Sequence, residues 1–252
     1  MIIEQDFSNK KFVITGASSD VGLKFIEEIG KTYKGENGPL LICHYYSNCD
    51  KLLKLAGKYP DLKIHLVKAD LSNSSEVDSL TADILDRMDA PDYFIHLPAN
   101  KFDYMRYKDM DMELVRKDME VQTYSFLELT KPLLPKMKKL DGSRVVVMLT
   151  AYVADDLPPQ FMVNYVVAKY ALLGAMKAVA SEFGGKKLLC NGISPVMMET
   201  KFLSNVDPKI IELSKSSAPN GELLQPEQVV PYIFELISNE CEKNGQNIYI
   251  GQ

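Results

Sequence analysis

Tryptophan is absent from this 252-residue sequence, and cysteine and histidine are scarce. The four cysteines form no CxxC pair, and the three histidines lie far apart in the sequence. We therefore expect no disulfide framework and no metal site, and we interpret the cysteines as free thiols in a reducing compartment. No apolar run approaches the ~20 residues of a membrane-spanning helix, and the first residues do not resemble a signal peptide. These absences predict a cytoplasmic protein without a membrane partner.

An excess of positive charge is also missing. The formal net charge is -5 at pH 7, which argues against a nucleic-acid partner but not against a small anionic ligand. The apolar share of 46% and the charged share of 25% are ordinary for a globular protein with a sizeable core. Because the chain has no Pro/Ser-rich linker, repeat or low-complexity tract, we expect residues 1–252 to form a single domain.

Short apolar runs alternate with segments of helical periodicity along the whole chain. The expected strands lie near residues 12–14, 40–45, 64–68, 93–97, 145–149, 188–193 and 247–250. The expected helices lie near residues 21–29, 50–58, 76–85, 111–139, 163–183 and 226–238. Repeated βα units with short connections predict an α/β protein with a doubly wound, Rossmann-like parallel sheet.

The most irregular stretch is residues 197–225, which follows the sixth expected strand and contains Pro208, Pro219 and Gly221. Ligands of doubly wound folds bind beyond the carboxyl ends of strands, so this stretch is either a substrate lid or a solvent loop with a short helix. Met197 and Met198 at its start either contact an apolar substrate or serve as packing.

A small-residue turn joins the first strand to the first helix. Residues 10–29 read KKFVITGASSDVGLKFIEEI, in which the turn is Thr15 to Ser19. A strand, a glycine-containing turn and a helix present backbone N–H groups and a helix N-terminus to a phosphate. Two glycines are few, so a ligand-free turn remains the alternative interpretation.

The pentapeptide YVVAK places Tyr165 and Lys169 four residues apart within an expected helix, so both side chains leave the same face. A phenol normally titrates near ~10, which is too high for acid–base work at neutral pH. We expect the neighbouring ammonium to favour the phenolate and to lower the pKa of Tyr165.

Taken together, these motifs resemble the short-chain dehydrogenase/reductase family. TGASSDVG at 15–22 resembles the family's TGxxxGxG loop, Asp70-Leu71 its acidic turn after the third strand, YVVAK its YxxxK motif, and NGISPVMMET at 191–200 its NxxxPGxxxT segment. The resemblance implies hydride transfer between a nicotinamide and a ketone or secondary alcohol. Tyr165 would then be the proton donor or acceptor, and Lys169 would assist it and bind the nicotinamide ribose.

The resemblance also implies the other residues of the site. Thr150 and Gln122 would take the places of the family's catalytic serine and helix asparagine. The implied cofactor-binding residues are Gly16, Ser18, Ser19, Asp20, Val21, Gly22, Tyr46, Ser47, Asp70, Leu71, Pro98, Ala99, Tyr165, Lys169, Pro195, Val196 and Thr200.

Four departures from the family pattern bear on this expectation. Asp20 replaces a glycine of the loop, and we expect its carboxylate to cap the helix and to point away from the phosphates. Thr150 supplies the serine's hydroxyl unless Ala151 is the true equivalent. Gln122 is one methylene longer than asparagine, and Leu97 to Asn100 and Val196 change the pocket wall. The alternative is a family member that binds nucleotide as a regulatory or interaction module without catalysis.

The cofactor and substrate are less legible. The segment HYYSN at 44–48 offers neither the carboxylate typical of NAD sites nor an Arg or Lys for the NADP phosphate. Its likeness to the HYRSN-type segment of NADP-using relatives favours NADP(H) over NAD(H). The resemblance suggests reductases of 3-oxoacyl thioesters, which are carrier-bound, although a sugar or polyketide-like ketone is equally compatible. It also implies a homo-oligomer, a dimer or tetramer, formed through the two long helices at 111–139 and 163–183.

Overall fold

The computed structural model describes residues 6–33, 37–101, 104–154, 157–185, 187–218 and 220–251. Its centre is a seven-stranded sheet in the order β3-β2-β1-β4-β5-β6-β7, and every pair of neighbouring strands is parallel. The strands are β1 (Lys11–Thr15), β2 (Leu40–Tyr45), β3 (Lys63–Lys68), β4 (Tyr93–His96), β5 (Ser143–Met148), β6 (Leu188–Pro195) and β7 (Asn247–Ile250). The predicted doubly wound α/β fold is therefore confirmed.

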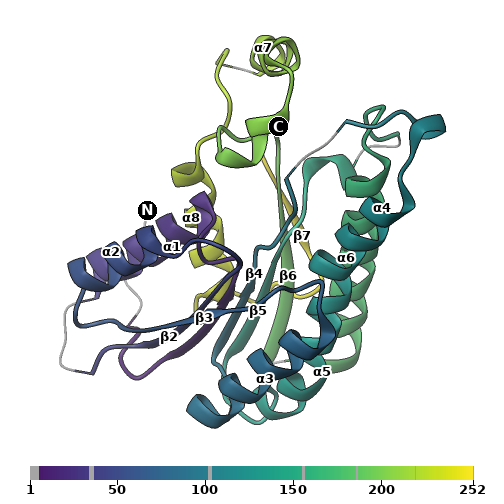
Figure 1. Ribbon diagram of the computed structural model, residues 1–252. Coiled ribbons are helices and arrows are strands. Elements are labelled where there is room, and N and C mark those ends of the chain that lie inside the picture. The colour runs from purple at the N-terminus through teal and green to yellow at the C-terminus, as the bar shows by residue number, and fades with distance from the viewer. Residues whose placement is uncertain are drawn as a thin grey trace.

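Helices cover both faces of this sheet (Figure 1). One face carries α1 (Asp20–Thr32), α2 (Asp50–Lys58) and α8 (Pro226–Ile237), and the other carries α3 (Ser74–Met88), α5 (Ser125–Met137) and α6 (Val163–Phe183). Successive strand residues point to opposite faces, so that Phe12 and Ile14 pack with α1 whereas Val13 packs with α3. Because both faces are buried, the strands read as continuous apolar runs.

The helix expected at 111–139 is interrupted in its middle. It consists of α4 (Met112–Met119), a π-helical segment η2 (Glu120–Tyr124) and α5. The carbonyl oxygen of Gln122, inside the π-helical segment, accepts a hydrogen bond from Nε2 of His96 at 2.9 Å. Pro132 and Pro135, residue types that often bend or end a helix, both lie inside α5. The interruption occurs instead where the helix meets β4, close to the carboxyl edge of the sheet.

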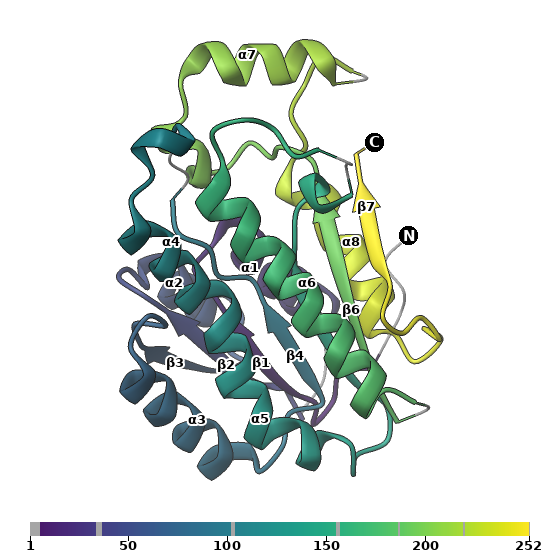
Figure 2. The same ribbon diagram turned by 90° about the vertical axis from the view of Figure 1, so that its right-hand side faces the viewer.

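The segment 197–225 projects from the carboxyl edge of the sheet. It contains the short helix η4 (Lys201–Asn205) and α7 (Pro208–Ser217), which lies across the end of the molecule (Figure 2). Its two ends are joined, because Glu199 N donates to Leu224 O at 2.9 Å and Leu224 N donates to Met197 O at 3.3 Å. No residue of α7 is buried, so its contacts with the rest of the molecule are limited.

Candidate active site

A cavity opens at the carboxyl edge of the sheet, where the strand order reverses between β1 and β4. Residues that follow β1, β4, β5 and β6 all contribute to its lining. Its volume is about 380 Å³, within the ~300–1,000 Å³ range of small-molecule sites. In doubly wound folds this reversal point is where ligands bind.

Most residues expected at the site do line this cavity. They are Gly16, Ser18, Ser19, Asp20, Val21, Tyr46, Asp70, Leu71, Pro98, Ala99, Thr150, Tyr165, Lys169, Pro195, Val196 and Thr200. Three other expected residues, Gly22, Ser47 and Gln122, are not among the described residues that line the cavity. A Cβ on Gly22 would lie 2.6 Å from the carbonyl oxygen of Ala17, so this glycine serves close packing. Ser47 is exposed, and Gln122 is fully buried beneath the cavity wall.

The glycine turn after β1 is supported by a histidine from β2. The backbone N–H of Gly16 donates to Nδ1 of His44 at 3.0 Å, which leaves the proton of this ring on Nε2, and Nε2 donates to Ala69 O at 3.0 Å. Burial lowers the pKa of His44, in keeping with a neutral ring. Gly16 has a φ of 69°, and a Cβ there would lie 3.1 Å from the backbone of Leu97 and Pro98. The turn is thus fixed in a shape that suits glycine.

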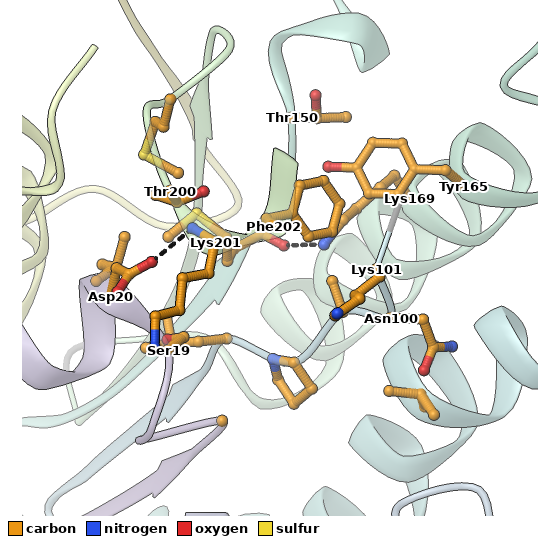
Figure 3. Close-up of a pocket in the computed structure, with 18 of the residues that line it drawn as sticks. Ser19, Asp20, Asn100, Lys101, Thr150, Tyr165, Lys169, Thr200, Lys201 and Phe202 are labelled. Atoms are coloured by element: carbon orange, nitrogen blue, oxygen red, sulfur yellow. Dashed lines mark hydrogen bonds between the residues drawn. The ribbon is translucent and has the colours of Figure 1, made fainter. Parts of the chain in front are cut away.

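Asp20 behaves differently from the sequence expectation. The helix cap is Ser19, whose Oγ accepts a hydrogen bond from Gly22 N at 3.1 Å. The Asp20 carboxylate instead accepts a hydrogen bond from the backbone N–H of Lys201 at 2.9 Å (Figure 3). It also lies 3.7 Å from Nζ of Lys51. Asp20 therefore connects the start of α1, directly after the glycine turn, to the segment 197–225.

Tyr165 and Lys169 both face the cavity from α6, as the spacing predicted. Nζ of Lys169 donates to the carbonyl oxygen of Met148 at 2.8 Å and lies 5.6 Å from the centroid of the Tyr165 ring. Thr150 follows β5 and is buried, and its side chain lies near the ring of Tyr165, where it acts to lower the pKa of the phenol. The three side chains thus converge on one wall of the cavity, with Thr150 and not Ala151 beside the phenol.

The direction of one pKa shift contradicts the sequence expectation. Burial raises the pKa of Tyr165 above its ordinary value, and the Thr150 side chain only partly opposes this effect. Although the Tyr165 ring keeps some exposure toward the cavity, its hydroxyl lies among protein atoms that destabilise a phenolate. Burial also lowers the pKa of Lys169 to about 7, against the attraction of Asp118. Desolvation therefore outweighs the effect that we expected Lys169 to have, and Tyr165 is held in its protonated form.

The second buried histidine is also structural. Nε2 of His96 donates to Gln122 O at 2.9 Å, and Nδ1 lies 2.8 Å from the hydroxyl of Thr15. Burial lowers the pKa of His96 to about 3, so the ring is neutral. Neither amide atom of Gln122 forms a hydrogen bond of regular geometry with the described residues, although its approach to Asp118 helps to lower the pKa of that carboxyl.

The segment 197–225 closes the outer side of the cavity. Phe202 of η4 packs against the Tyr165 ring with 5.6 Å between centroids, and Val206 is buried in a small apolar cluster with Met162 and Val166. Met197 and Met198 both line the cavity. The wall near Tyr165 is therefore largely apolar and aromatic.

Several lining residues carried no sequence signal that we used. They are His44, Ala69, Lys101, Tyr104, Lys117, Val121, Met148, Leu149, Tyr152, Met162, Lys201, Phe202, Leu203 and Val206. Lys117 and Val121 are four residues apart and share a helix face. Once either residue is known to line the cavity, helical periodicity predicts that the other lines it too. His44 and Lys201 depend on contacts between distant segments, which periodicity does not report.

The residues present fit a dinucleotide. The glycine turn, the small side chains of Ser18 and Ser19, and the lining cations Lys201 and Lys117 suit an anionic ligand, and the Asp20 charge is partly offset by Lys51. Across the described residues, no cluster of histidine, cysteine or acidic side chains could hold a metal ion. The described helices include none that is long and apolar enough to cross a membrane.

Comparisons with known proteins agree with this geometry. A family model described as "Enoyl-(Acyl carrier protein) reductase" matches residues 31–251. The chain is 26% identical over 236 residues to "Uncharacterized oxidoreductase YmfI" of Bacillus subtilis (strain 168), covering 92% of this chain and 93% of that protein. It is 27% identical over 209 residues to "NADPH-dependent aldehyde reductase 2, chloroplastic" of Arabidopsis thaliana, covering 80% of this chain and 74% of that protein.

Among solved structures, levodione reductase superposes with a TM-score of 0.87 at 17% identity, covering 98% of this chain and 97% of that chain. At this identity the likeness concerns the fold alone. The family model, however, spans most of the chain, and the curated relatives above are named as an oxidoreductase and an aldehyde reductase. The chain therefore belongs to the short-chain dehydrogenase/reductase family of oxidoreductases.

Proposed function

We propose that this protein is an NADP(H)-dependent reductase that interconverts a ketone and a secondary alcohol. The observation that carries the proposal is the convergence of Thr150, Tyr165 and Lys169 on one wall of a cavity whose opposite wall is a glycine turn and helix N-terminus. When bound, the nicotinamide would supply a hydride to the carbonyl carbon during reduction or accept one during oxidation.

In reduction, the Thr150 hydroxyl orients the carbonyl oxygen and Tyr165 donates the proton that this oxygen gains. The raised pKa of Tyr165 keeps the phenol protonated, as a proton donor requires. Lys169 stabilises the phenolate that forms, provided that its ammonium is charged at that moment. Gln122 takes a supporting role through its carbonyl, which is bound to His96.

The preference for NADP(H) is supported by the end of β2. Tyr46 lines the cavity and is exposed, and the next carboxylate along the chain is Asp50, in the first turn of α2. A carboxylate at the position of Tyr46 would accept hydrogen bonds from a ribose diol and repel a 2′-phosphate. Its absence removes this obstacle to NADPH.

The substrate we propose is a ketone with an apolar body, because Tyr152, Met162 and Phe202 line the cavity near Tyr165. Segment 197–225 would act as its lid. A carrier-bound 3-oxoacyl thioester belongs in the test panel, since its reacting group is a ketone.

We also propose a homo-oligomer that associates through α5 and α6, which lie on one face of the molecule (Figure 2). Large apolar side chains are exposed on these helices and on η2 between α4 and α5: Tyr124, Leu127, Val167 and Tyr170. Burial of such side chains in a partner helix pair would be favourable.

The test is a two-stage measurement on the purified protein. First, NADPH and NADH are titrated by fluorescence; then their oxidation is followed with a panel of aliphatic, cyclic and thioester-linked ketones. We expect NADPH binding and turnover with at least one ketone, and a loss of roughly 10²-fold or more in kcat for Tyr165→Phe with little change in cofactor affinity. Full turnover by Tyr165→Phe would refute the mechanism. Binding without any turnover would instead identify an inert nucleotide-binding protein.

A further inference from the structure

A buried carboxylate connects α4, the loop after β4 and the start of α6, close to Tyr165 and Lys169. Asp118 on α4 is 4% exposed. Its Oδ1 accepts a hydrogen bond from Nδ2 of Asn100, and its Oδ2 accepts one from Nδ2 of Asn164, both at 2.7 Å. Asn100 lies in the loop after β4, and Asn164 in the first turn of α6. One side chain thus ties α4 to the cavity wall and to the helix that carries the proton donor.

The position of these partners relates the carboxylate to catalysis. Asn164 immediately precedes Tyr165, and Asn100 follows Pro98 and Ala99, which line the cavity with it. The Asp118 charge also acts on Lys169, because it opposes the effect of burial on the pKa of that ammonium. Neither effect requires the carboxylate to touch the substrate.

We propose that Asp118 is a positioning residue of this site: its carboxylate fixes the start of α6 against the loop after β4, and its negative charge favours the ammonium form of Lys169. The catalytic part of this inference rests on the proposed function, whereas the electrostatic coupling between Asp118 and Lys169 does not.

The other groups around Lys169 cannot replace this charge. His96 on β4 is neutral, because burial lowers its pKa to about 3, and Tyr165 on α6 is held protonated. The contact from β5 is the Met148 carbonyl, which carries no net charge. Among the described residues, Asp118 is the group identified as raising the pKa of Lys169.

Burial also raises the pKa of Asp118, while the two asparagine hydrogen bonds and the charge of Lys169 act in the opposite direction. Asp118 and Lys169 therefore each favour the charged form of the other against the effect of burial, and this coupling has to be reciprocal. An uncharged group that served only as a mechanical brace would not show it. In Asp118→Asn, the new amide oxygen can accept from one of the two asparagines and the new amide nitrogen can donate to the flipped amide of the other, so the variant removes the charge and retains the brace.

The titration of Lys169 tests the proposal without a substrate. Protein labelled with ¹³C at lysine Cε is titrated by NMR, and the Lys169 signal is assigned by its loss in Lys169→Met. We expect the midpoint of Lys169 to fall by roughly one pH unit in Asp118→Asn and to stay unchanged in Asp111→Asn, the exposed N-cap of the same helix. An equal midpoint in folded wild type and folded Asp118→Asn would overturn the proposal.

The reciprocal measurement does not depend on the folding of Asp118→Asn. Protein labelled with ¹³C at aspartate Cγ should show the midpoint of Asp118 rising in Lys169→Met, and an unchanged midpoint would contradict the coupling. Once a ketone substrate is known, Asp118→Asn should lower kcat by about tenfold and move the alkaline loss of activity to lower pH. Coupled titrations without turnover on any ketone would refute the proposed function and leave the electrostatic inference standing.

Discussion

Replacement of Lys169 by methionine should stabilise the protein near pH 6 while it removes catalysis. Burial lowers the pKa of Lys169 from 10.5 to about 7, so the charged ammonium costs about 5 kcal/mol of folding stability below pH 7. Methionine has a similar length and no charge. It leaves the Met148 carbonyl without its 2.8 Å hydrogen bond, at a cost of ~1–3 kcal/mol. The net gain is about 3 kcal/mol, or roughly 6–12 °C in Tm for a chain of this size.

The sign of the pH dependence is fixed by the same shift. Between the folded-state pKa near 7 and the unfolded value of 10.5, the unfolded chain binds more protons, so wild-type stability rises with pH. At pH 9.5 the remaining cost of the ammonium is only ~1.4 kcal/mol, which the lost hydrogen bond cancels. The advantage of Lys169→Met should therefore be present at pH 6 and absent at pH 9.5.

Urea denaturation at the two pH values measures this difference, with Lys177→Met as the control because Lys177 is an exposed lysine on the same helix. The control should match wild type at both values. If Lys169→Met were less stable than wild type at pH 6, or if its advantage were equal at pH 6 and pH 9.5, the assignment of a desolvated ammonium would be wrong.

Three further changes test other parts of the site. Asp20→Asn keeps an acceptor for Lys201 N but removes a negative charge near the position proposed for the pyrophosphate. NADPH should therefore bind several-fold more tightly in a fluorescence titration. Equal or weaker binding would count against a pyrophosphate beside Asp20. Tyr46→Asp should reverse the preference to NADH, measured as the ratio of the two dissociation constants, and an unchanged ratio would mean that another residue meets the 2′ position. Leu127→Glu should convert the proposed oligomer to monomers in light scattering, whereas Leu53→Glu, which changes an exposed leucine on α2, should not.

The alternation of strands and helices was predictable because each parallel strand is buried on both faces and each helix buries one stripe. Helix α6 was predicted with the bounds that the structure shows, Val163–Phe183, since Gly184 follows it directly. The π-helical segment was not predictable from periodicity. It coincides with a tertiary hydrogen bond from His96 to Gln122, two residues that are far apart in the sequence.

The site residues were predictable only where a local motif carries them. The glycine turn and the Tyr165–Lys169 pair are both local motifs, and their residues line the cavity as expected. The pKa of Tyr165 was predicted in the wrong direction because spacing reports the neighbouring ammonium but not the depth of burial. Nothing in the local sequence distinguishes Asp118 from an exposed acidic residue. It becomes buried only because α4, α6 and the loop after β4 pack together in the fold.

Asp20 and Asp118 are both carboxylates at unfavourable positions, and both connect separate segments of the site. Asp20 places a carboxylate in the lining of the cavity, where it disfavours an anionic ligand, and Asp118 places one where it is desolvated. Each also makes connections that a neutral apolar residue would not make, Asp20 to the backbone of segment 197–225 and Asp118 to Asn100 and Asn164. Asp20 thereby ties segment 197–225 to the start of α1, and Asp118 ties the start of α6 to the loop after β4. Because ionised acceptors form stronger hydrogen bonds than neutral ones, these ties hold the two halves of the site together at some cost in overall stability.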